Sequence, residues 1–156
     1  MSEEKQVLGW REWITLPQLG IPWLKAKVDT GARTSALHAF RIDSFSEGGA
    51  PWIQFQLHPV QHDTGAVIVC QAPVLERRWV TDSGGHRQKR PVIVTDVALG
   101  GQVWPIELTL TQRDTMRFRM LLGRTALKGR FTIDPELSYC LGKKRPKPFS
   151  SQGKTE

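Results

Sequence analysis

Apolar and polar residues alternate along most of this chain with the two-residue period of half-buried β-strands. The clearest stretch is residues 24–29, where aliphatic side chains alternate with two lysines and an aspartate. Turn-forming Gly, Pro and Asp residues separate this stretch from further segments with the same period, at 36–46, 52–58, 67–70, 74–80, 90–97 and 103–110. The pattern predicts an all-β fold.

One short helical turn interrupts the expected β pattern. The apolar run Met120–Leu122 ends at Gly123, and residues 124–128 then read as a single turn that stops at Gly129. The last strands are expected at Phe131–Ile133 and Leu137–Leu141. Residues 142–156 are rich in Lys, Pro, Ser and Gln, which is typical of disorder. We therefore expect one domain over 1–141 and a basic, disordered tail over 142–156.

Composition limits the class of protein. A chain of 156 residues with 24% charged and 39% hydrophobic residues is long enough for one domain with its own core. No apolar run reaches the length of a membrane span, and the N-terminus does not resemble a secretory signal. Cys70 and Cys140 lie in apolar segments and are expected to be buried free thiols. A cytoplasmic location follows from these features.

The net charge of +7 indicates a partner that carries negative charge. A nucleic-acid-binding β-barrel is one interpretation, because phosphate recognition requires Lys and Arg. The basic residues are scattered, however, and only 143–148 forms a basic run, so nucleic acid is the less favoured partner. An acidic peptide fits the same charge.

Two short motifs define the candidate site. An apolar strand runs into Asp29-Thr30-Gly31, and a second apolar strand later ends at Gly123-Arg124. This pair resembles the retroviral-type aspartic proteases, the retropepsins. With residues 83–86 and 90–93, the chain is more narrowly similar to a bacterial retropepsin-like family labelled "ATP-dependent zinc protease", whose genes neighbour ATP-grasp (RimK-like) ligases. The resemblance implies a retropepsin-like closed barrel with one short helix after Gly123.

The resemblance also implies a role for each matching residue. Asp29 would hold the attacking water, Thr30 would hydrogen-bond to a partner loop, and Gly31 would present its N–H to the carboxylate. The residues expected to contact substrate are Ala32, Arg33, Ser83, Gly84, Gly85, His86 and Arg124. Those expected to support the loop are Leu121, Leu122 and Gly123.

Peptide hydrolysis by this chemistry requires two carboxylates that share one proton, the established behaviour of the aspartic-protease dyad. A second Asp-Thr-Gly-Ala occurs at 63–66, but no apolar strand precedes it, so we interpret it as a hairpin turn. The chain thus offers one catalytic loop, and a homodimer would supply the second. We expect its interface to include the Asp29 loops and the strand Leu137–Leu141. A retropepsin-like module that binds acidic peptides without cleaving them is the alternative.

The resemblance also implies a flap, a glycine-tipped hairpin that closes over substrate. The hairpin around Ser83–His86 is the favoured candidate, and the tip at Gly48-Gly49 is the other. We expect no metal and no cofactor. His58 and His62 are separated by Pro59 and do not form a metalloprotease motif, and no phosphate-binding loop of the Walker type occurs.

Two positions depart from the family pattern. Ala32 lacks the hydroxyl that many pepsin-like enzymes carry there, so we expect activity at mildly acidic to near-neutral pH. Arg33 stands where retroviral proteases have an aspartate that pairs with the arginine corresponding to Arg124. Either an internal carboxylate (Glu107, Asp114 or Asp134) lies between the two arginines, or both face the cleft and bind substrate carboxylates, for example those of a Glu-rich peptide.

Overall fold

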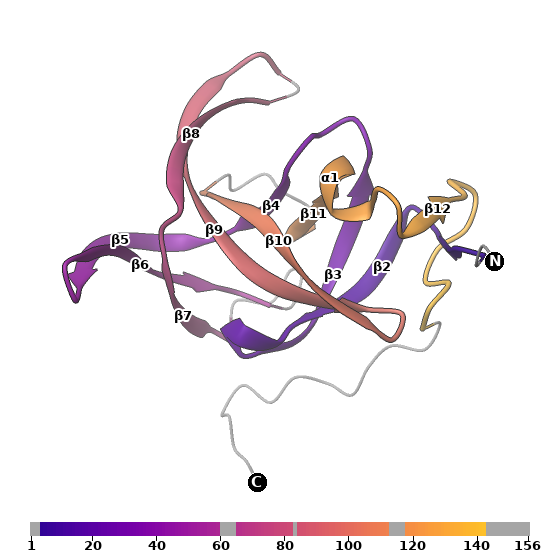
Figure 1. The fold of residues 1–156 in the computed structure, drawn as a ribbon, viewed down its shortest axis with the longest axis horizontal. Helices are drawn as coiled ribbons and strands as arrows, with labels where there is room; N and C mark the ends of the chain where they lie inside the picture. Colours follow the sequence, from indigo (N-terminus) through magenta and orange to yellow (C-terminus); the bar gives the residue numbers. More distant parts are fainter. Residues whose placement is uncertain (1–3, 60–64, 83, 113–117, 143–156) are drawn as a thin grey trace, which may run out of the picture.

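The computed structural model describes residues 4–59, 65–82, 84–112 and 118–142. It is built of strands, with one 3-10 turn, η1 (Pro17–Leu19), and one helical turn, α1 (Arg124–Leu127), which confirms the all-β class (Figure 1). The strands are β1 (Gln6–Leu8), β2 (Arg11–Leu16), β3 (Ile21–Asp29), β4 (Ser35–His38), β5 (Phe40–Glu47), β6 (Ala50–Leu57), β7 (Ile68–Pro73), β8 (Glu76–Thr81), β9 (Arg87–Leu99), β10 (Gln102–Thr111), β11 (Met120–Gly123) and β12 (Phe131–Ile133).

The main sheet curls into a barrel. Its strand order is β10-β4-β11-β3-β2-β9-β8, and a further pairing of β10 with β9 returns the order to its start. Closure is uneven, because the β2–β9 junction contains one registered pair, Thr15 with Ala98, whereas β9 and β10 pair from Leu99 back to Val92. The strand order thus returns to its start, but the sheets do not close into the clean barrel that the resemblance implies, because this junction is weak. Strand β8 extends beyond the ring.

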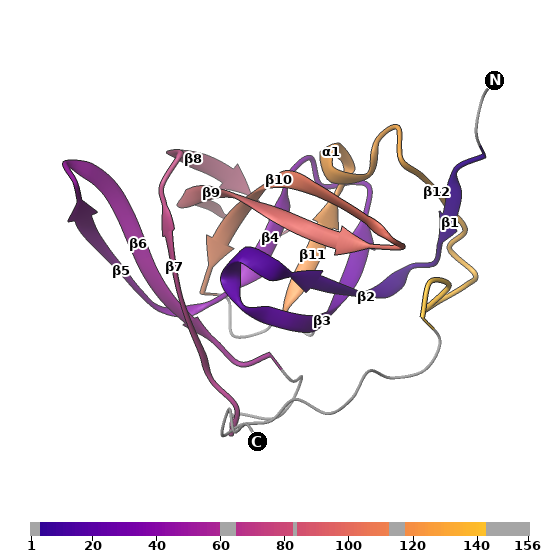
Figure 2. The ribbon, with the colours of Figure 1, turned by 60° about the horizontal axis from the view of Figure 1, so that its bottom comes forward.

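A separate antiparallel sheet, β5-β6-β7, leans against one side of the barrel (Figure 2). The hydrophobic core is continuous between the two sheets, because Ile53, Phe55 and Leu57 of β6 pack in the same cluster as Leu24 of β3 and Leu122 of β11. All five of these side chains are fully buried. Their burial from water is the main force that fixes the strands around the site.

The C-terminal segment differs from prediction. No strand forms at Leu137–Leu141; the segment instead wraps across the start of β2. The carboxylate of Glu12, which is fully buried, accepts hydrogen bonds from the backbone N–H groups of Gly9, Cys140 and Leu141 at 2.7, 2.9 and 3.2 Å. A buried charge with three such donors is well satisfied.

Several other expectations can be placed in the structure. Cys70 is buried and Cys140 is half-buried, and both are free thiols, so complete burial was wrong for Cys140. The second Asp-Thr-Gly-Ala falls in the connection between β6 and β7, where Asp63 and Thr64 lie outside the described residues. The tail 143–156 is also outside them. In the described part of the chain, no helix is long and apolar enough to cross a membrane.

Candidate active site

Asp29 is the last residue of β3 and is half-buried at one end of the barrel. Its Oδ1 accepts a hydrogen bond from the N–H of Gly31 at 3.1 Å, and its carbonyl accepts one from the N–H of Ala32 at 3.1 Å. The loop therefore folds back on the aspartate immediately after the strand. A carboxylate at the end of an ordered strand keeps a fixed direction, as a catalytic group requires.

The loop rests on the second motif. Gly123 N–H donates to the Ser35 hydroxyl at 3.0 Å, and a Cβ on Gly123 would lie 2.6 Å from the Thr34 carbonyl carbon. Only glycine allows two backbones to approach so closely. Leu122, one residue earlier, is fully buried beneath the loop, whereas Leu121 is half-buried at the edge of the cleft. These positions are compatible with the supporting role predicted for 121–123.

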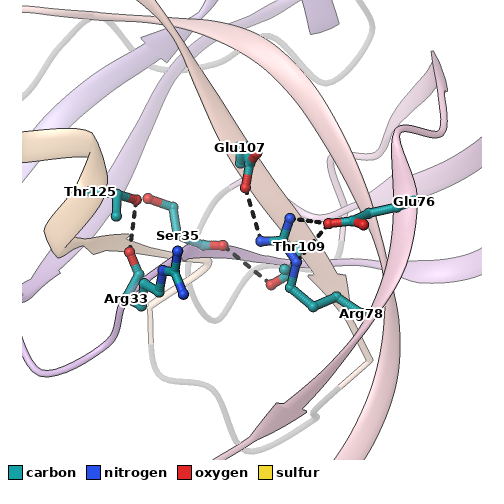
Figure 3. A network of polar contacts seen from close by, with 7 residues as sticks. All are labelled: Arg33, Ser35, Glu76, Arg78, Glu107, Thr109 and Thr125. Carbon is teal, nitrogen blue, oxygen red and sulfur yellow. Dashed lines mark hydrogen bonds and ion pairs between the residues drawn. The ribbon is translucent and has the colours of Figure 1, made fainter.

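Helix α1 provides further hydrogen bonds to the loop. The N–H groups of Arg124 and Thr125 donate to the carbonyls of Ala32 and Arg33 at 2.7 and 3.1 Å. The Thr125 hydroxyl also donates to the Arg33 carbonyl at 2.8 Å (Figure 3). The Arg124 guanidinium donates to the Thr30 carbonyl at 2.9 Å. Arg124 is thus used to hold the loop, and it is not among the described residues that line the cleft.

A cleft of about 600 Å³ opens beside Asp29. One wall is the loop itself, through Asp29, Gly31, Ala32, Arg33 and Thr34. The opposite wall is strand β8 and the residue after it, over 78–82. The remaining described lining residues are Ala36, Arg90, Thr109, Thr111 and Leu121.

The hairpin that lines the cleft is β8–β9, through residues 78–82 and Arg90, and it is the hairpin that the sequence analysis favours as a flap. It rises from the barrel and bends towards the end that carries α1 (Figure 1). Its tip is ordered by Asp82, whose Oδ1 accepts hydrogen bonds from the N–H groups of Gly84 and His86, both at 2.9 Å. Gly85 takes a positive φ of 85° in the turn. Asp82 lines the cleft, while Gly84, Gly85 and His86 are exposed and do not; Ser83 lies outside the described residues.

Arg33 and Arg124 form no ion pair with any described residue. Of the three carboxylates proposed to lie between them, Glu107 pairs with Arg78 instead, and Asp134 accepts a hydrogen bond from the Glu136 N–H. The third, Asp114, is outside the described residues. Arg33 lines the cleft, so of the two arginines it has the position expected for a substrate contact.

The sequence analysis missed a second basic group in the cleft, formed by Arg78 and Arg90 on the β8–β9 hairpin. These two residues are direct register partners of β8 and β9, and both line the cleft. Arg78 donates from Nε to Glu76 and from Nη1 to Glu107, each at 2.9 Å, and also contacts Glu76 through Nη2 (Figure 3). The hydrogen bonds to Glu76 and Glu107 raise the pKa of Arg78 above its ordinary value.

Arg90 is 6% exposed and is held by Gln88, whose side-chain oxygen accepts from Arg90 Nε at 2.9 Å. The same oxygen accepts from the Thr111 hydroxyl at 3.3 Å. With Arg33, the described residues that line the cleft include three arginines and two aspartates, Asp29 and Asp82. The one available signal was the strand period, which puts residues 78 and 80 on the same face of β8.

A β-barrel that delivers an aspartate to the floor of a hairpin-covered cleft is the acid-protease type of fold. Comparison with known proteins gives the family. The model of the RimB-like family, described as the retropepsin-like aspartic endopeptidase RimB, matches residues 7–144. The chain belongs to this family.

The relatives extend the comparison to a different class of protein. The chain is 46% identical over 144 residues to a probable alpha-L-glutamate ligase of Shewanella pealeana, and 51% identical over 138 residues to one of Parasynechococcus marenigrum. These matches cover 92% and 88% of this chain but only 31% and 30% of the ligases. The chain therefore spans about a third of the length of these curated relatives.

A solved structure has the same fold. The crystal structure of Lpg0085, a protein of unknown function from Legionella pneumophila, aligns with a TM-score of 0.72 at 26% sequence identity. The alignment covers 88% of this chain and 99% of that one.

Proposed function

We propose that the protein is an aspartic peptidase whose active form is a homodimer, with one Asp29 from each protomer. The observation that carries the proposal is the position of Asp29, at the end of a barrel strand and on the floor of a cleft under a hairpin. Membership of a retropepsin-like endopeptidase family supports it. We take residues 1–141 as the domain, in agreement with the match over 7–144.

In the proposed reaction the two Asp29 carboxylates share one proton, because two like charges about 3 Å apart do not both ionise. The ionised carboxylate takes a proton from water as the water oxygen bonds to the substrate carbonyl carbon. The other carboxylic acid gives its proton to the carbonyl oxygen. The proton taken from water then passes to the amide nitrogen as the carbon–nitrogen bond breaks. At the same time the hydroxyl formed from the carbonyl oxygen returns its proton to the other carboxylate, so the dyad again holds one proton and regains its starting state.

The loop has features that fit a partner protomer. Thr30 and Gly31 are exposed in the single chain, although both follow directly from the barrel strand. The Thr30 carbonyl is occupied by Arg124, which leaves the hydroxyl as the group that would cross the two-fold axis. Leu137–Leu141 forms no strand, so the proposed interface contains no C-terminal strand.

For substrate we propose peptides rich in glutamate or amide bonds made by a glutamate ligase. Arg33, Arg78 and Arg90 give the cleft a basic lining, and guanidinium groups bind carboxylates with two parallel hydrogen bonds. The curated relatives are named as glutamate ligases, which supports a peptidase that acts on the products of such an enzyme. Two free cysteines suit a reducing compartment, so we propose a cytoplasmic location.

A module that binds acidic peptides without cleaving them is the second candidate. It is favoured by one observation: in the described chain Asp29 is the cleft aspartate of the Asp-Thr-Gly loop, whereas the other, Asp82, holds the hairpin tip through the N–H groups of Gly84 and His86. One catalytic carboxylate cannot supply both proton transfers. The same basic lining would serve binding alone. Oligomeric state therefore separates the two candidates.

The decisive experiment compares Asp29→Asn with wild type on a quenched Glu-rich peptide. The amide keeps the shape of the side chain but cannot accept a proton, so we expect cleavage to be lost while circular dichroism and melting temperature stay unchanged. Asp43→Asn, at an exposed position of β5, is the matched control and should cleave normally. Cleavage that survives Asp29→Asn but is abolished by a chelator would overturn the proposal.

A further inference from the structure

The guanidinium of Arg78 is bound by two carboxylates at the wall of the cleft. Glu76 lies two residues earlier on the same strand, and Glu107 lies on β10, which pairs with β9 and not with β8. Arg78 therefore links the flap to the barrel wall across the intervening strand. Its side chain is 31% exposed, and those of Glu76 and Glu107 are 49% and 43% exposed.

The two carboxylates bind Arg78 differently. Glu107 accepts from Nη1. Glu76 accepts from both Nε and Nη2, but through the single oxygen Oε2. The Nε/Nη2 edge of an arginine matches the two oxygens of a carboxylate in parallel hydrogen bonds, so the Glu76 contact uses this edge incompletely. An external carboxylate that offered both oxygens would form the better pair.

Exchange of Glu76 for an external carboxylate is also favoured because the Arg78–Glu76 pair is partly exposed to solvent. Ion pairs between partly exposed side chains contribute little net free energy, because water solvates the separated groups almost as well. Replacing Glu76 by another carboxylate therefore costs little. Glu107, on the barrel wall, would keep its hydrogen bond to Nη1 and so hold the arginine in the same place during the exchange.

We propose that Arg78 determines specificity by binding a carboxylate side chain of the substrate, and that Glu76 is an internal competitor that occupies Arg78 when the cleft is empty. This inference rests on the proposed function of the cleft, because it assumes that substrate lies between the Asp29 loop and β8. Its consequence is a preference for glutamate over glutamine at one substrate position. Removing Glu76 should strengthen that preference.

The test measures binding and not cleavage. A fluorescent peptide of alternating Glu and Ala, and its Gln/Ala counterpart, are titrated against full-length protein carrying Asp29→Asn, with fluorescence anisotropy as the readout. In this background Arg78→Gln should reduce the preference for the Glu peptide about tenfold, the loss of one charge-assisted pair. Glu76→Gln should increase affinity for the Glu peptide several-fold and leave the Gln peptide unchanged.

Arg77→Gln is the matched control. Arg77 precedes Arg78 on β8, points to the opposite face, donates to the Ser44 hydroxyl at 2.8 Å and is not among the described cleft residues. The Arg77→Gln substitution removes the same charge as Arg78→Gln. An equal loss of preference for the Glu peptide in both variants would therefore show a general charge effect and overturn the inference. A fall in Glu-peptide affinity in Glu76→Gln would also overturn it. Melting curves of each variant check folding.

Failure of this inference is distinguishable from failure of the proposed function. If wild type cleaves the Glu peptide and Arg78→Gln keeps the full preference in binding, the peptidase stands and the role of Arg78 is wrong. If wild type cleaves nothing while Arg78→Gln and Glu76→Gln shift the affinity for the Glu peptide in opposite directions, Arg78 binds substrate carboxylates in a protein that is not a peptidase.

Discussion

Asp29 and Gly123 are register partners at the ends of two parallel strands, β3 and β11. The aspartate extends towards the cleft, and the glycine brings the backbone of β11 against that of Thr34 and Ser35. The position of the candidate catalytic carboxylate thus depends on a residue with no side chain.

Gly123→Ala should destabilise the protein and misplace the loop. The new Cβ would lie 2.6 and 2.8 Å from the carbonyl carbon and oxygen of Thr34, which are backbone atoms and cannot rotate away. We expect a loss of about 3 kcal/mol in the free energy of unfolding, at the upper end of overpacking costs. Urea denaturation measures it. Gly142→Ala, where a Cβ meets nothing within 4 Å, should change stability by less than about 0.5 kcal/mol.

Dimer formation should depend on Thr30. If its hydroxyl crosses the two-fold axis, Thr30→Ala removes one hydrogen bond in each direction and weakens association, which sedimentation velocity over a concentration series detects. Thr132→Ala, at an exposed position of β12, should leave association unchanged. Wild type that remains monomeric at concentrations on the order of tens of micromolar would contradict the peptidase proposal.

The pH–activity profile should respond to position 32. Ala32 donates no side-chain hydrogen bond to the Asp29 carboxylate, whose Oδ1 accepts from the Gly31 N–H. Ala32→Ser would add a donor that stabilises the ionised carboxylate, so the optimum should move to lower pH. Rates measured from pH 4 to pH 8 test this. A profile that does not move in Ala32→Ser, or that moves equally in the exposed control Ala50→Ser, would reject the explanation.

The thiol of Cys70 should make stability depend on pH under alkaline conditions. Burial raises its pKa from 9.0 to about 12. Between these two pKa values the folded state holds the proton that the unfolded state releases. The stabilisation that the protonated thiol gives the folded state is therefore complete below pH 9 and is lost as pH rises towards 12. In this window the free energy of unfolding of the wild type should fall by about 1.4 kcal/mol per pH unit relative to that of Cys70→Ala. Parallel stability curves for the two proteins would exclude the effect.

The sequence predicted those parts of the site that depend on local pattern. The strand period places Asp29 at the end of β3, and the glycine after Leu122 marks where β11 ends. The strand predicted at Leu137–Leu141 does not form, for a reason that local sequence patterns do not show. The Glu12 carboxylate accepts hydrogen bonds from the N–H groups of Cys140 and Leu141, which lie more than a hundred residues further along the chain. These N–H groups are therefore not available to pair in a sheet.

Arg78 illustrates the same limit within the site. The alternation of β8 predicts which side chains share its inner face, but the contact with Glu107 depends on how far the hairpin curls over β10. Likewise, the sequence predicts a substrate contact for Arg124 because Arg33 stands where retroviral proteases have the aspartate that pairs with the matching arginine. Its hydrogen bond to the Thr30 carbonyl depends on the path of the loop, which Arg33 in place of an aspartate does not reveal.

Strand β9 belongs to two parts of the molecule at once. Its first half pairs with β8 in the flap and its second half pairs with β10 in the barrel, and Val92 is in register with both Glu76 and Thr109. The flap therefore has no hinge loop on this side. We expect any opening of the tip to be transmitted along this continuous strand to its far end, where Ala98 pairs with Thr15. If the hairpin opens as a flap, amide exchange at that pair, remote from the cleft, should rise with it.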